Sequence, residues 1–395
     1  MEIEIKQMDQ TGNGIGFIDN KIVFVSKAIT GDIVDIKIDQ DKKNYSKAHI
    51  NKIIKPSLKR IPSLCPFFDK CGGCQLFNMS YDDTLTYKKD RIANILKPLN
   101  LKVDVELISN KEEINYRNKI ELKIKNSKIG FYENDSNDLV EIDNCLITKK
   151  CINAFLNELK EMHIKDGEVT IRCNYNDELL VIINTKDDIK IKDDYSSYKV
   201  VGIILNNETI YGENFFMDMI NGYFFKVSYD AFFQVNSYIN SKLFHIIEDN
   251  VKGKKVLDLY SGVGTLSIAS SKTADTIYGI EVIPNAVLDA IQNAKMNNVK
   301  NINFLMGKVE DKIALIKDDI DTVIIDPPRK GLDNKTREFI LDSNYKNIIY
   351  ISCEAQNLVK DLKELLNKYI VKKIYILDMF SYTYHCECVT ILERR

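Results

Sequence analysis

Alternating apolar and polar residues at the start of the chain predict short β-strands. The runs MEIEIKQMD, GIGFIDNKIVFVSK, GDIVDIKID and SKAHINKIIK are separated by glycines and by an Asp-Asn pair, which favour turns. Four short runs of this kind predict a small all-β barrel or sandwich, which we place at residues 1–58.

The pattern over residues 59–230 is mixed. Residues 80–99 predict a helix that Ser80 caps and Pro98 ends, and residues 148–162 predict a second helix. The rest returns to strand alternation, as in KIELKIK. We therefore expect a mostly β central domain.

Apolar runs and helical stretches alternate over residues 231–395. Such βα units with near-continuous apolar strands predict a doubly wound parallel sheet, so the fold class of the chain is α/β. The last two apolar runs, VKKIYILDMF and CVTILERR, have no helix between them. They are therefore expected to pair antiparallel and to close one edge of the sheet. The parallel strands before them are KVLDLY, TIYGIEV, NINFLMG, DTVIIDPP and NIIYISC.

Composition narrows the class of protein without identifying its partner. The 395 residues are 45% hydrophobic and 28% charged, as in globular proteins, and no apolar run reaches the roughly 20 residues of a membrane span. The N-terminus lacks the features of a signal peptide, so we expect a cytoplasmic location. We also expect no membrane, no protein partner and a monomer. Basic stretches at 42–60 and 115–130 fit either nucleic-acid phosphates or solvated faces.

A ligand site is predicted where VLDLYSGVGTLSIAS turns from strand to helix. Its glycines allow a ligand to approach the backbone, and Glu281 at the end of the next strand can accept hydrogen bonds from ribose hydroxyls. Ser267 occupies the third glycine position of a dinucleotide motif. This difference favours an adenosyl ligand without pyrophosphate, such as S-adenosylmethionine.

Three further polar residues are expected at the same sheet edge. Asp326 precedes two prolines at a strand end, Cys353 ends the next strand, and Glu387 begins the last, antiparallel strand. A thiol that adds to C6 of a pyrimidine and a carboxylate that removes the C5 proton suit methylation of C5. Taken alone, Cys353 fits a core residue better than a nucleophile, and Glu387 fits an exposed charge at a strand edge better than a base.

A cluster of cysteines predicts a metal site. Cys65, Cys71 and Cys74 surround two glycines within ten residues, and Cys145 offers a fourth ligand. Their spacing leaves zinc and iron-sulfur chemistry open. The remaining cysteines are interpreted as structural: Cys151, Cys173, Cys386 and Cys388.

Taken together and in order, these motifs resemble the RNA (uracil-5-)-methyltransferases, in particular the iron-sulfur members that act on 23S rRNA. Residues 10–38 are similar to a TRAM domain, and CPFFDKCGGC with Cys145 is similar to the family's [4Fe-4S] site. FFQVN, DLYSGVGT, GIEV, DPPRKG, ISC and DMFSYTYHCE follow in the family's order.

The resemblance implies a role for each matching residue. Cys353 is expected to be the nucleophile and Glu387 the base, and the stretch around NYRNK is expected to face RNA. The residues expected to bind S-adenosylmethionine are Gln234, Tyr260, Glu281 and Asp326. 23S rRNA is favoured over the T-loop of tRNA because tRNA members typically lack the TRAM and cluster segments. A non-catalytic RNA-binding protein stays open, whereas cytosine C5 methyltransferases have a Pro-Cys motif that this chain lacks.

Two positions depart from the family's pattern. Glu354 and Ala355 follow Cys353 where members usually have Asn-Pro, and Ser381 replaces the proline after DMF. A carboxylate beside the thiol would raise the pKa of that thiol if it pointed inward. Glu354 is therefore the neighbouring residue that bears most on whether Cys353 acts as the nucleophile.

Overall fold

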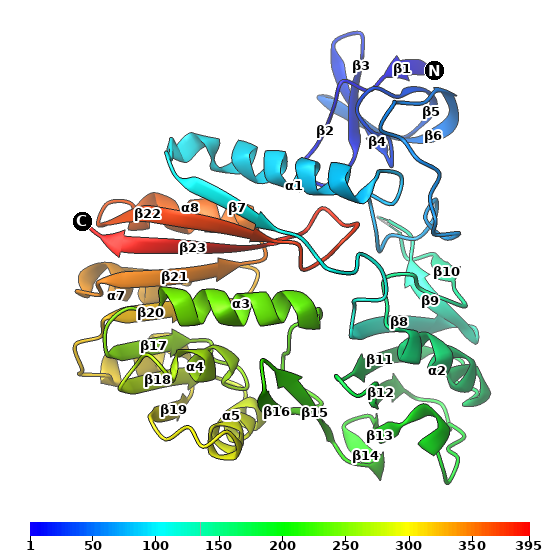
Figure 1. Cartoon of the computed structure of the whole chain (residues 1–395). Coiled ribbons are helices and arrows are strands. Elements are labelled where there is room, and N and C mark those ends of the chain that lie inside the picture. The colour runs from blue at the N-terminus through cyan, green and yellow to red at the C-terminus, as the bar shows by residue number, and fades with distance from the viewer. Residues whose placement is uncertain (135) are drawn as a thin grey trace.

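The computed structural model describes residues 1–134 and 136–395. It shows a small β-barrel at the N-terminus, a β-rich middle and a layered α/β unit at the C-terminus (Figure 1). None of the helices described is long and apolar enough to cross a lipid bilayer.

The N-terminal strands form one six-stranded sheet in the order β1-β5-β6-β4-β3-β2. Alternate residues point inward, so that Val23, Val25 and Val34 are buried in its small core, as the alternating pattern predicts. Its strands are β1 (Glu2–Glu4), β2 (Gln7–Met8), β3 (Gly14–Ile18), β4 (Lys21–Ser26), β5 (Ile33–Asp41) and β6 (Tyr45–Lys55).

The middle of the chain forms a seven-stranded sheet in the order β10-β9-β8-β11-β12-β13-β14, next to a hairpin of β15 and β16. Helix α2 (Lys150–Glu161) covers this sheet through Ile152 and Phe155 and lies where the sequence predicts it. The strands are β8 (Lys119–Lys125), β9 (Lys128–Tyr132), β10 (Leu139–Glu141), β11 (Gly167–Cys173), β12 (Leu179–Thr185), β13 (Val200–Leu205), β14 (Glu208–Gly212), β15 (Phe215–Ile220) and β16 (Tyr223–Ser228).

The C-terminal sheet has eight strands in the order β19-β18-β17-β20-β21-β23-β22-β7. The five predicted parallel strands pair parallel, and β23 runs antiparallel between β21 and β22. The strands are β7 (Asp104–Ile108), β17 (Lys255–Leu259), β18 (Thr276–Glu281), β19 (Ile302–Met306), β20 (Thr322–Ile325), β21 (Asn347–Ser352), β22 (Tyr369–Leu377) and β23 (Glu387–Arg394).

Helices cover both faces of this sheet. Helices α3, α4 and α5 pack on one face, and α1, α6, α7 and α8 on the other. Ser80 caps α1 as predicted, because its side chain accepts a hydrogen bond from the backbone N–H of Asp83. The helices are α1 (Tyr81–Leu96), α3 (Ser237–Asn250), α4 (Thr265–Ser270), α5 (Pro284–Met296), α6 (Val309–Lys312), α7 (Asn334–Asp342) and α8 (Ala355–Leu365).

The prediction that the last two strands close one edge of the sheet is wrong. Strand β7, from the region assigned to the central domain, pairs parallel with β22 and takes the edge position. Helix α1 accompanies it, since Ile92 is buried in the same core as Leu358 of α8. The outer edge of β22 was free to accept a partner that lies far away in the sequence, which a local pattern does not reveal.

A buried ion pair joins α1 to the loop that follows β22. The ammonium of Lys88 contacts the carboxylate of Asp378, and both side chains are at most 1% exposed. Asp378 also accepts hydrogen bonds from the hydroxyls of Tyr81 and Ser381, each at 2.6 Å. The loop before Glu387 is therefore held by a satisfied polar network.

We predict that Lys88→Met lowers the free energy of unfolding by about 3–5 kcal/mol, because it leaves the Asp378 carboxylate buried without its counter-charge. Urea unfolding followed by circular dichroism measures this change. The matched control is Lys89→Met on the exposed side of the same helix turn, for which we expect a change below about 0.5 kcal/mol. Equal stability of the two variants would contradict the assignment.

Candidate active site

Cys353 and Glu387 face each other across two neighbouring strands. Cys353 directly follows β21, and Glu387 is the first residue of β23. The antiparallel register pairs Ser352 with Cys388, which places Cys353 opposite Glu387. The structure thus brings together the two residues that the sequence assigns to one edge of the sheet.

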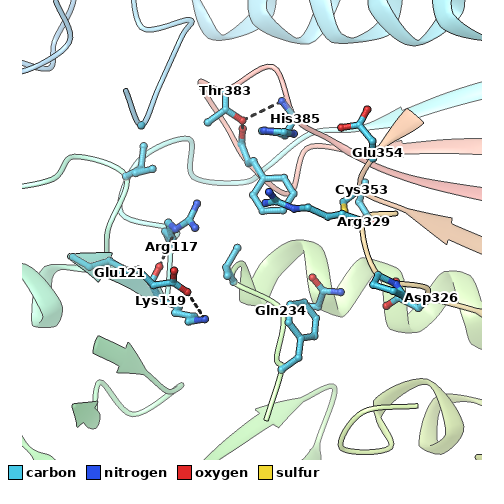
Figure 2. A pocket seen from close by; sticks show the side chains of 18 of the residues that line it. Arg117, Lys119, Glu121, Gln234, Asp326, Arg329, Cys353, Glu354, Thr383 and His385 are labelled. Atoms are coloured by element: carbon cyan, nitrogen blue, oxygen red, sulfur yellow. Dashed lines mark hydrogen bonds and ion pairs between the residues drawn. The ribbon is translucent and has the colours of Figure 1, made fainter. Parts of the chain in front are cut away.

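Both residues line one cavity of about 990 Å³. It opens at the carboxyl ends of the parallel strands, where open α/β sheets bind their ligands. Figure 2 shows Gln234, Asp326 and Cys353 around this space. All four residues expected to bind the methyl donor line the same cavity: Gln234, Tyr260, Glu281 and Asp326.

The turn after β17 allows close approach at this edge. Gly264 has a φ of 84°, and a Cβ there would lie 2.9 Å from the Phe304 ring, so a side chain is excluded. Tyr260 also has a positive φ, of 66°. The Glu281 carboxylate accepts hydrogen bonds from the backbone N–H groups of Gly262 at 2.9 Å and Val282 at 2.7 Å. These contacts hold the Glu281 carboxylate beside the glycine turn.

Burial disfavours negative charge around Cys353. Burial and the nearby Glu387 raise the pKa of the Cys353 thiol to about 12. Burial, followed by the charge of Asp326, raises the pKa of Glu387 well above its usual range. Burial also raises the pKa of Asp326 to about 7. Arg329 opposes these shifts, since its positive charge lowers the pKa of both Cys353 and Glu387.

We predict that Arg329→Gln slows alkylation of Cys353 by iodoacetamide on the order of tenfold at about pH 8, because loss of the positive charge raises the thiol pKa further. Below that pKa the alkylation rate should increase about tenfold per pH unit in wild type and variant, since only the thiolate reacts. Mass spectrometry of the tryptic peptide 347–360 measures the rate. Arg329→Lys is the matched control and should retain most of the wild-type rate.

Glu354 points away from the thiol that it follows. Figure 2 shows its carboxylate directed away from Cys353. The acidic groups that raise the pKa of Cys353 are Glu387 and Asp326, whereas Glu354 raises the pKa of Tyr384 after the effect of burial. Glu354 lines the same cavity as Cys353, but its carboxylate is not among the main groups that raise the pKa of the thiol.

The loop between β22 and β23 contains Ser381, the second position that differs from the family's pattern. The carbonyl of Tyr382 accepts hydrogen bonds from the N–H groups of Gln75 at 3.1 Å and Leu76 at 3.0 Å. Its ring stacks on Phe77, with 4.0 Å between the centroids. Tyr382 has a φ of 61°, and the hydroxyl of the preceding Ser381 donates a hydrogen bond of 2.6 Å to Asp378, a contact that a proline could not make. The loop is thereby fixed against the segment that carries Cys71 and Cys74.

Two further cavity residues were not predicted, His385 and Phe232. His385 lies two residues before Glu387, and burial, followed by the charge of Arg329, lowers its pKa to about 4, so its imidazole is neutral near neutral pH. Phe232 lines the cavity with 65% of its surface exposed. An exposed aromatic ring in a cavity can stack on an unpaired base. Arg117, in the basic stretch expected to face RNA, also lines the cavity.

The cysteines of the predicted metal site line the same cavity and are partly buried. Lys27 of the N-terminal barrel donates a hydrogen bond of 2.9 Å to the carbonyl of Cys71. Burial raises the pKa of the Cys65, Cys71 and Cys74 thiols, so they bind their protons strongly unless a cation is present. The four residues are Cys65, Cys71, Cys74 and Cys145.

The arrangement of these four cysteines indicates whether they fit a single zinc ion or an iron-sulfur cluster. Within residues 1–134 and 136–395, the one set of three metal-binding side chains whose ligand atoms all lie within 4.8 Å is Cys151, Cys173 and Asp177. No three of the four sulfur atoms are therefore as close together as the thiolates around a single zinc ion, which lie about 3.8 Å apart. Cysteine thiolates are also the usual ligands of iron-sulfur clusters, so the chemistry of the donor set fits such a cluster.

Two family models match the chain. Residues 199–395 match the model described as tRNA (Uracil-5-)-methyltransferase, and residues 1–50 match the TRAM domain. The first match contains the glycine turn, Cys353 and Glu387, and the second covers most of the six-stranded barrel.

Similar proteins cover the whole chain. An uncharacterized RNA methyltransferase of Caldanaerobacter subterraneus is 35% identical over 100% of this chain and 98% of its own. An uncharacterized RNA methyltransferase of Aquifex aeolicus is 30% identical over 100% of this chain and 98% of its own. A solved structure, the tRNA (uracil-54, C5)-methyltransferase of Pyrococcus abyssi in complex with S-adenosyl-L-homocysteine, has a TM-score of 0.81 and 25% identity over 99% of this chain and 100% of that chain.

Proposed function

The chain belongs to the RNA (uracil-5-)-methyltransferase family, and from this premise we propose that Cys353 and Glu387 carry out the reaction and that 23S rRNA is its substrate. The enzyme methylates C5 of uracil in RNA and depends on S-adenosylmethionine. The position of Cys353 opposite Glu387 in one cavity carries the proposal for these two residues.

The proposed chemistry begins with the thiolate of Cys353. It adds to C6 of the uracil, which makes C5 nucleophilic enough to accept a methyl group. S-adenosylmethionine supplies this group from its sulfonium. Glu387 then removes the C5 proton, the C5–C6 double bond re-forms, and Cys353 leaves C6. Because the strands hold both residues at one edge, the same pair can begin and end the reaction.

The proposed binding residues fall into two groups, one for the methyl donor and one for the RNA. Glu281 would hold the ribose of the methyl donor, with Gln234, Tyr260 and Asp326 around the rest of it. Phe232 and Arg117 line the same cavity, and we assign them to the RNA: Phe232 would stack on the uracil and Arg117 would contact phosphate. The target base has to leave its stack to enter this space.

The substrate is tested by mapping 5-methyluridine in rRNA and tRNA by mass spectrometry, from cells with and without the gene. Loss of 5-methyluridine from 23S rRNA alone is the expected result. Complementation with the wild-type gene should restore it, and complementation with Cys353→Ala should not. Loss confined to tRNA would overturn the choice of substrate.

The T-loop of tRNA is the second candidate substrate. The similar enzyme of Pyrococcus abyssi is named as a tRNA (uracil-54, C5)-methyltransferase, and its whole chain is covered by this one. That enzyme therefore departs from the expectation that tRNA members typically lack the TRAM and cluster segments, since the match extends over 99% of this chain. The proposal of 23S rRNA rests on the resemblance of the cysteine and TRAM motifs to the rRNA-modifying members.

We also propose that Cys65, Cys71, Cys74 and Cys145 hold a [4Fe-4S] cluster. Support comes from their common position on the cavity wall and from a spacing wider than a single zinc ion requires. The surrounding aromatic residues would shield such a cluster from water. When bound, the group would supply a rigid cross-link between residues 65–74 and Cys145.

We predict that the protein purified without oxygen contains about four iron and four sulfide per chain. Cys74→Ser should lose most of both, since it removes a ligand, whereas Cys151→Ser should retain them. Colorimetric iron and sulfide analysis together with the visible absorption spectrum measure this. About one zinc per chain and no iron would contradict the proposal.

A further inference from the structure

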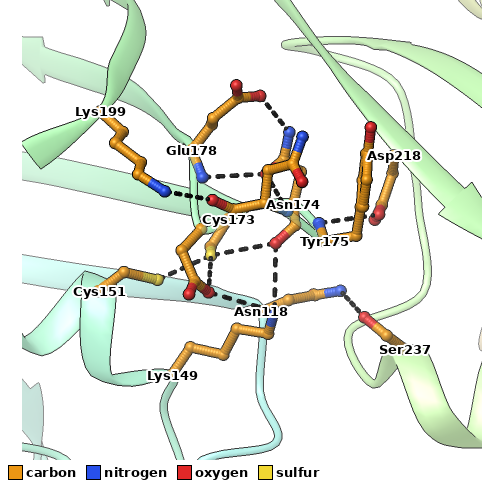
Figure 3. Close-up of polar contacts among 12 residues, drawn as sticks. Asn118, Lys149, Cys151, Cys173, Asn174, Tyr175, Glu178, Lys199, Asp218 and Ser237 are labelled. Atoms are coloured by element: carbon orange, nitrogen blue, oxygen red, sulfur yellow. Dashed lines mark hydrogen bonds and ion pairs between the residues drawn. The ribbon is translucent and has the colours of Figure 1, made fainter. Parts of the chain in front are cut away.

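Two cysteines outside the cavity lie unusually close together. Cys151 is in the first turn of α2, and Cys173 is the last residue of β11. Their sulfur atoms are 2.7 Å apart, and Figure 3 shows the two side chains pointing toward each other. This distance is near the roughly 2.05 Å of a disulfide bond, so little movement is needed to form one.

The two thiols have different surroundings. Cys151 is partly exposed, whereas Cys173 is 1% exposed. The hydrogen bond from Cys173 lowers the pKa of Cys151, and the charge of Lys149 lowers it further. Two acceptors surround the Cys173 sulfur, the carbonyl oxygen of Asn174 at 3.4 Å and Oδ1 of Asp177 at 3.8 Å. Cys151 is therefore the accessible nucleophile, and Cys173 is held as the protonated thiol.

We propose that Cys151 and Cys173 form a reversible dithiol–disulfide pair that hydroperoxides oxidise. The Cys151 thiolate takes the terminal oxygen of hydrogen peroxide and becomes a sulfenic acid, and hydroxide leaves. The Cys173 sulfur then attacks the Cys151 sulfur, so that the S–S bond forms, the S–O bond breaks, and water leaves with the thiol proton. Two electrons pass to the peroxide, and a small dithiol returns them when it reduces the disulfide.

A metal ion fits this set less well. Asp177 provides a third ligand atom within 4.8 Å of both sulfurs. Its carboxylate, however, already contacts the ammonium of Lys149 at 3.6 Å, and this positive charge would repel a cation. Zinc-bound thiolates lie about 3.8 Å apart, which is farther than these two sulfurs. The geometry thus favours the bond between the sulfurs over a shared metal.

The pair lies directly behind the cavity wall. The backbone N–H of Cys173 donates to the carbonyl of Asn118 at 2.8 Å, and that of Lys149 donates to Arg117 at 3.0 Å. Asn118 in turn donates from its side chain to the carbonyl of Gln234 at 3.2 Å. A disulfide would join the two segments that support Arg117 and Asn118, independently of which RNA is the substrate.

The test uses the full-length protein, reduced and purified without oxygen. It is treated with a small molar excess of hydrogen peroxide, unfolded, alkylated and digested with trypsin. The expected product is a cross-link between peptides 151–160 and 173–186 with the loss of two hydrogens. Alkylation of Cys151 should fall about tenfold and should recover after dithiothreitol. The peptide 374–394, with the buried Cys386 and Cys388, is the internal control and should stay alkylated.

Two variants make the result specific. In Cys151→Ser, Cys173 should stay fully alkylated after the same treatment, because the nucleophile is absent; in Cys173→Ala, Cys151 should be over-oxidised instead of cross-linked. Full alkylation of both thiols in the treated wild-type protein would overturn the proposal, as would a cross-link from Cys151 to a different cysteine. Retention of Zn²⁺ through dialysis by the wild-type protein, but not by Cys151→Ser, would also overturn the proposal.

Discussion

Replacement of Cys353 by alanine is expected to reduce methyl transfer by about 10⁴-fold or more, because uracil C5 is a poor nucleophile until the thiolate adds to C6. The side chain is partly exposed to the cavity opposite Glu387, so alanine is expected to leave the surrounding strands in place. The measurement is transfer of a labelled methyl group from S-adenosylmethionine to 23S rRNA from cells that lack the gene, with tRNA from the same cells in parallel.

Two controls separate loss of chemistry from loss of structure. Cys353→Ala should bind S-adenosyl-L-homocysteine with wild-type affinity in calorimetry, since none of the proposed donor-binding residues is changed. Glu354→Gln alters the neighbouring residue, whose carboxylate points away from the thiol, and should stay within about threefold of the wild-type rate. Normal turnover by Cys353→Ala would remove the nucleophile from the proposed reaction.

Replacement of Glu387 by glutamine is expected to trap a covalent complex between the enzyme and RNA. Glutamine has nearly the same shape as glutamate, and Glu387 is only 4% exposed, so the buried site is preserved. The amide of glutamine, however, does not accept the C5 proton. Cys353 can then add to C6 of the uracil. The bond between its sulfur and C6 cannot be broken by elimination, because the C5 proton is not removed. The complex should appear on a denaturing gel as a slow band that contains both protein and RNA.

The double variant Cys353→Ala/Glu387→Gln is the matched control for this complex. It should give no band that resists denaturation, because the bond to C6 is absent. Mass spectrometry of the nuclease-digested band should place a methylated nucleotide on peptide 347–360, which contains Cys353. Release of methylated RNA by Glu387→Gln at the wild-type rate would assign the base to another residue.

Local pattern predicted most of the elements of this fold. Ser80 caps its helix, α2 begins and ends within two residues of the predicted range, and the strands before Tyr260, Asp326 and Cys353 pair parallel. The polarity of these strands also explains why Cys353 and Glu387 were expected at one edge. The place of β7 was not predictable, because the pairing of two half-buried strands depends on which edge is left open elsewhere in the chain.

The cavity contains more than its motifs indicate. A single histidine or phenylalanine has no periodicity, so His385 and Phe232 become visible as site residues only when the loop and the turn that carry them are in place. The FFQVN motif and the position of His385 two residues before Glu387 are the signals that could have identified them. The closeness of Cys151 and Cys173 had no such signal in the sequence, where each was interpreted as structural.

The edge position of β7 constrains how this protein is made. Residues 104–108 leave the ribosome long before β22, the strand that they pair with, has been synthesised. Until then α1 and β7 keep apolar surface and backbone hydrogen-bonding groups without their final partners. A chain that stops before β22 leaves this segment exposed, and a C-terminal fragment alone leaves the edge of β22 open to other strands. Synthesis of nearly the whole chain therefore precedes completion of the sheet on which the active site is built.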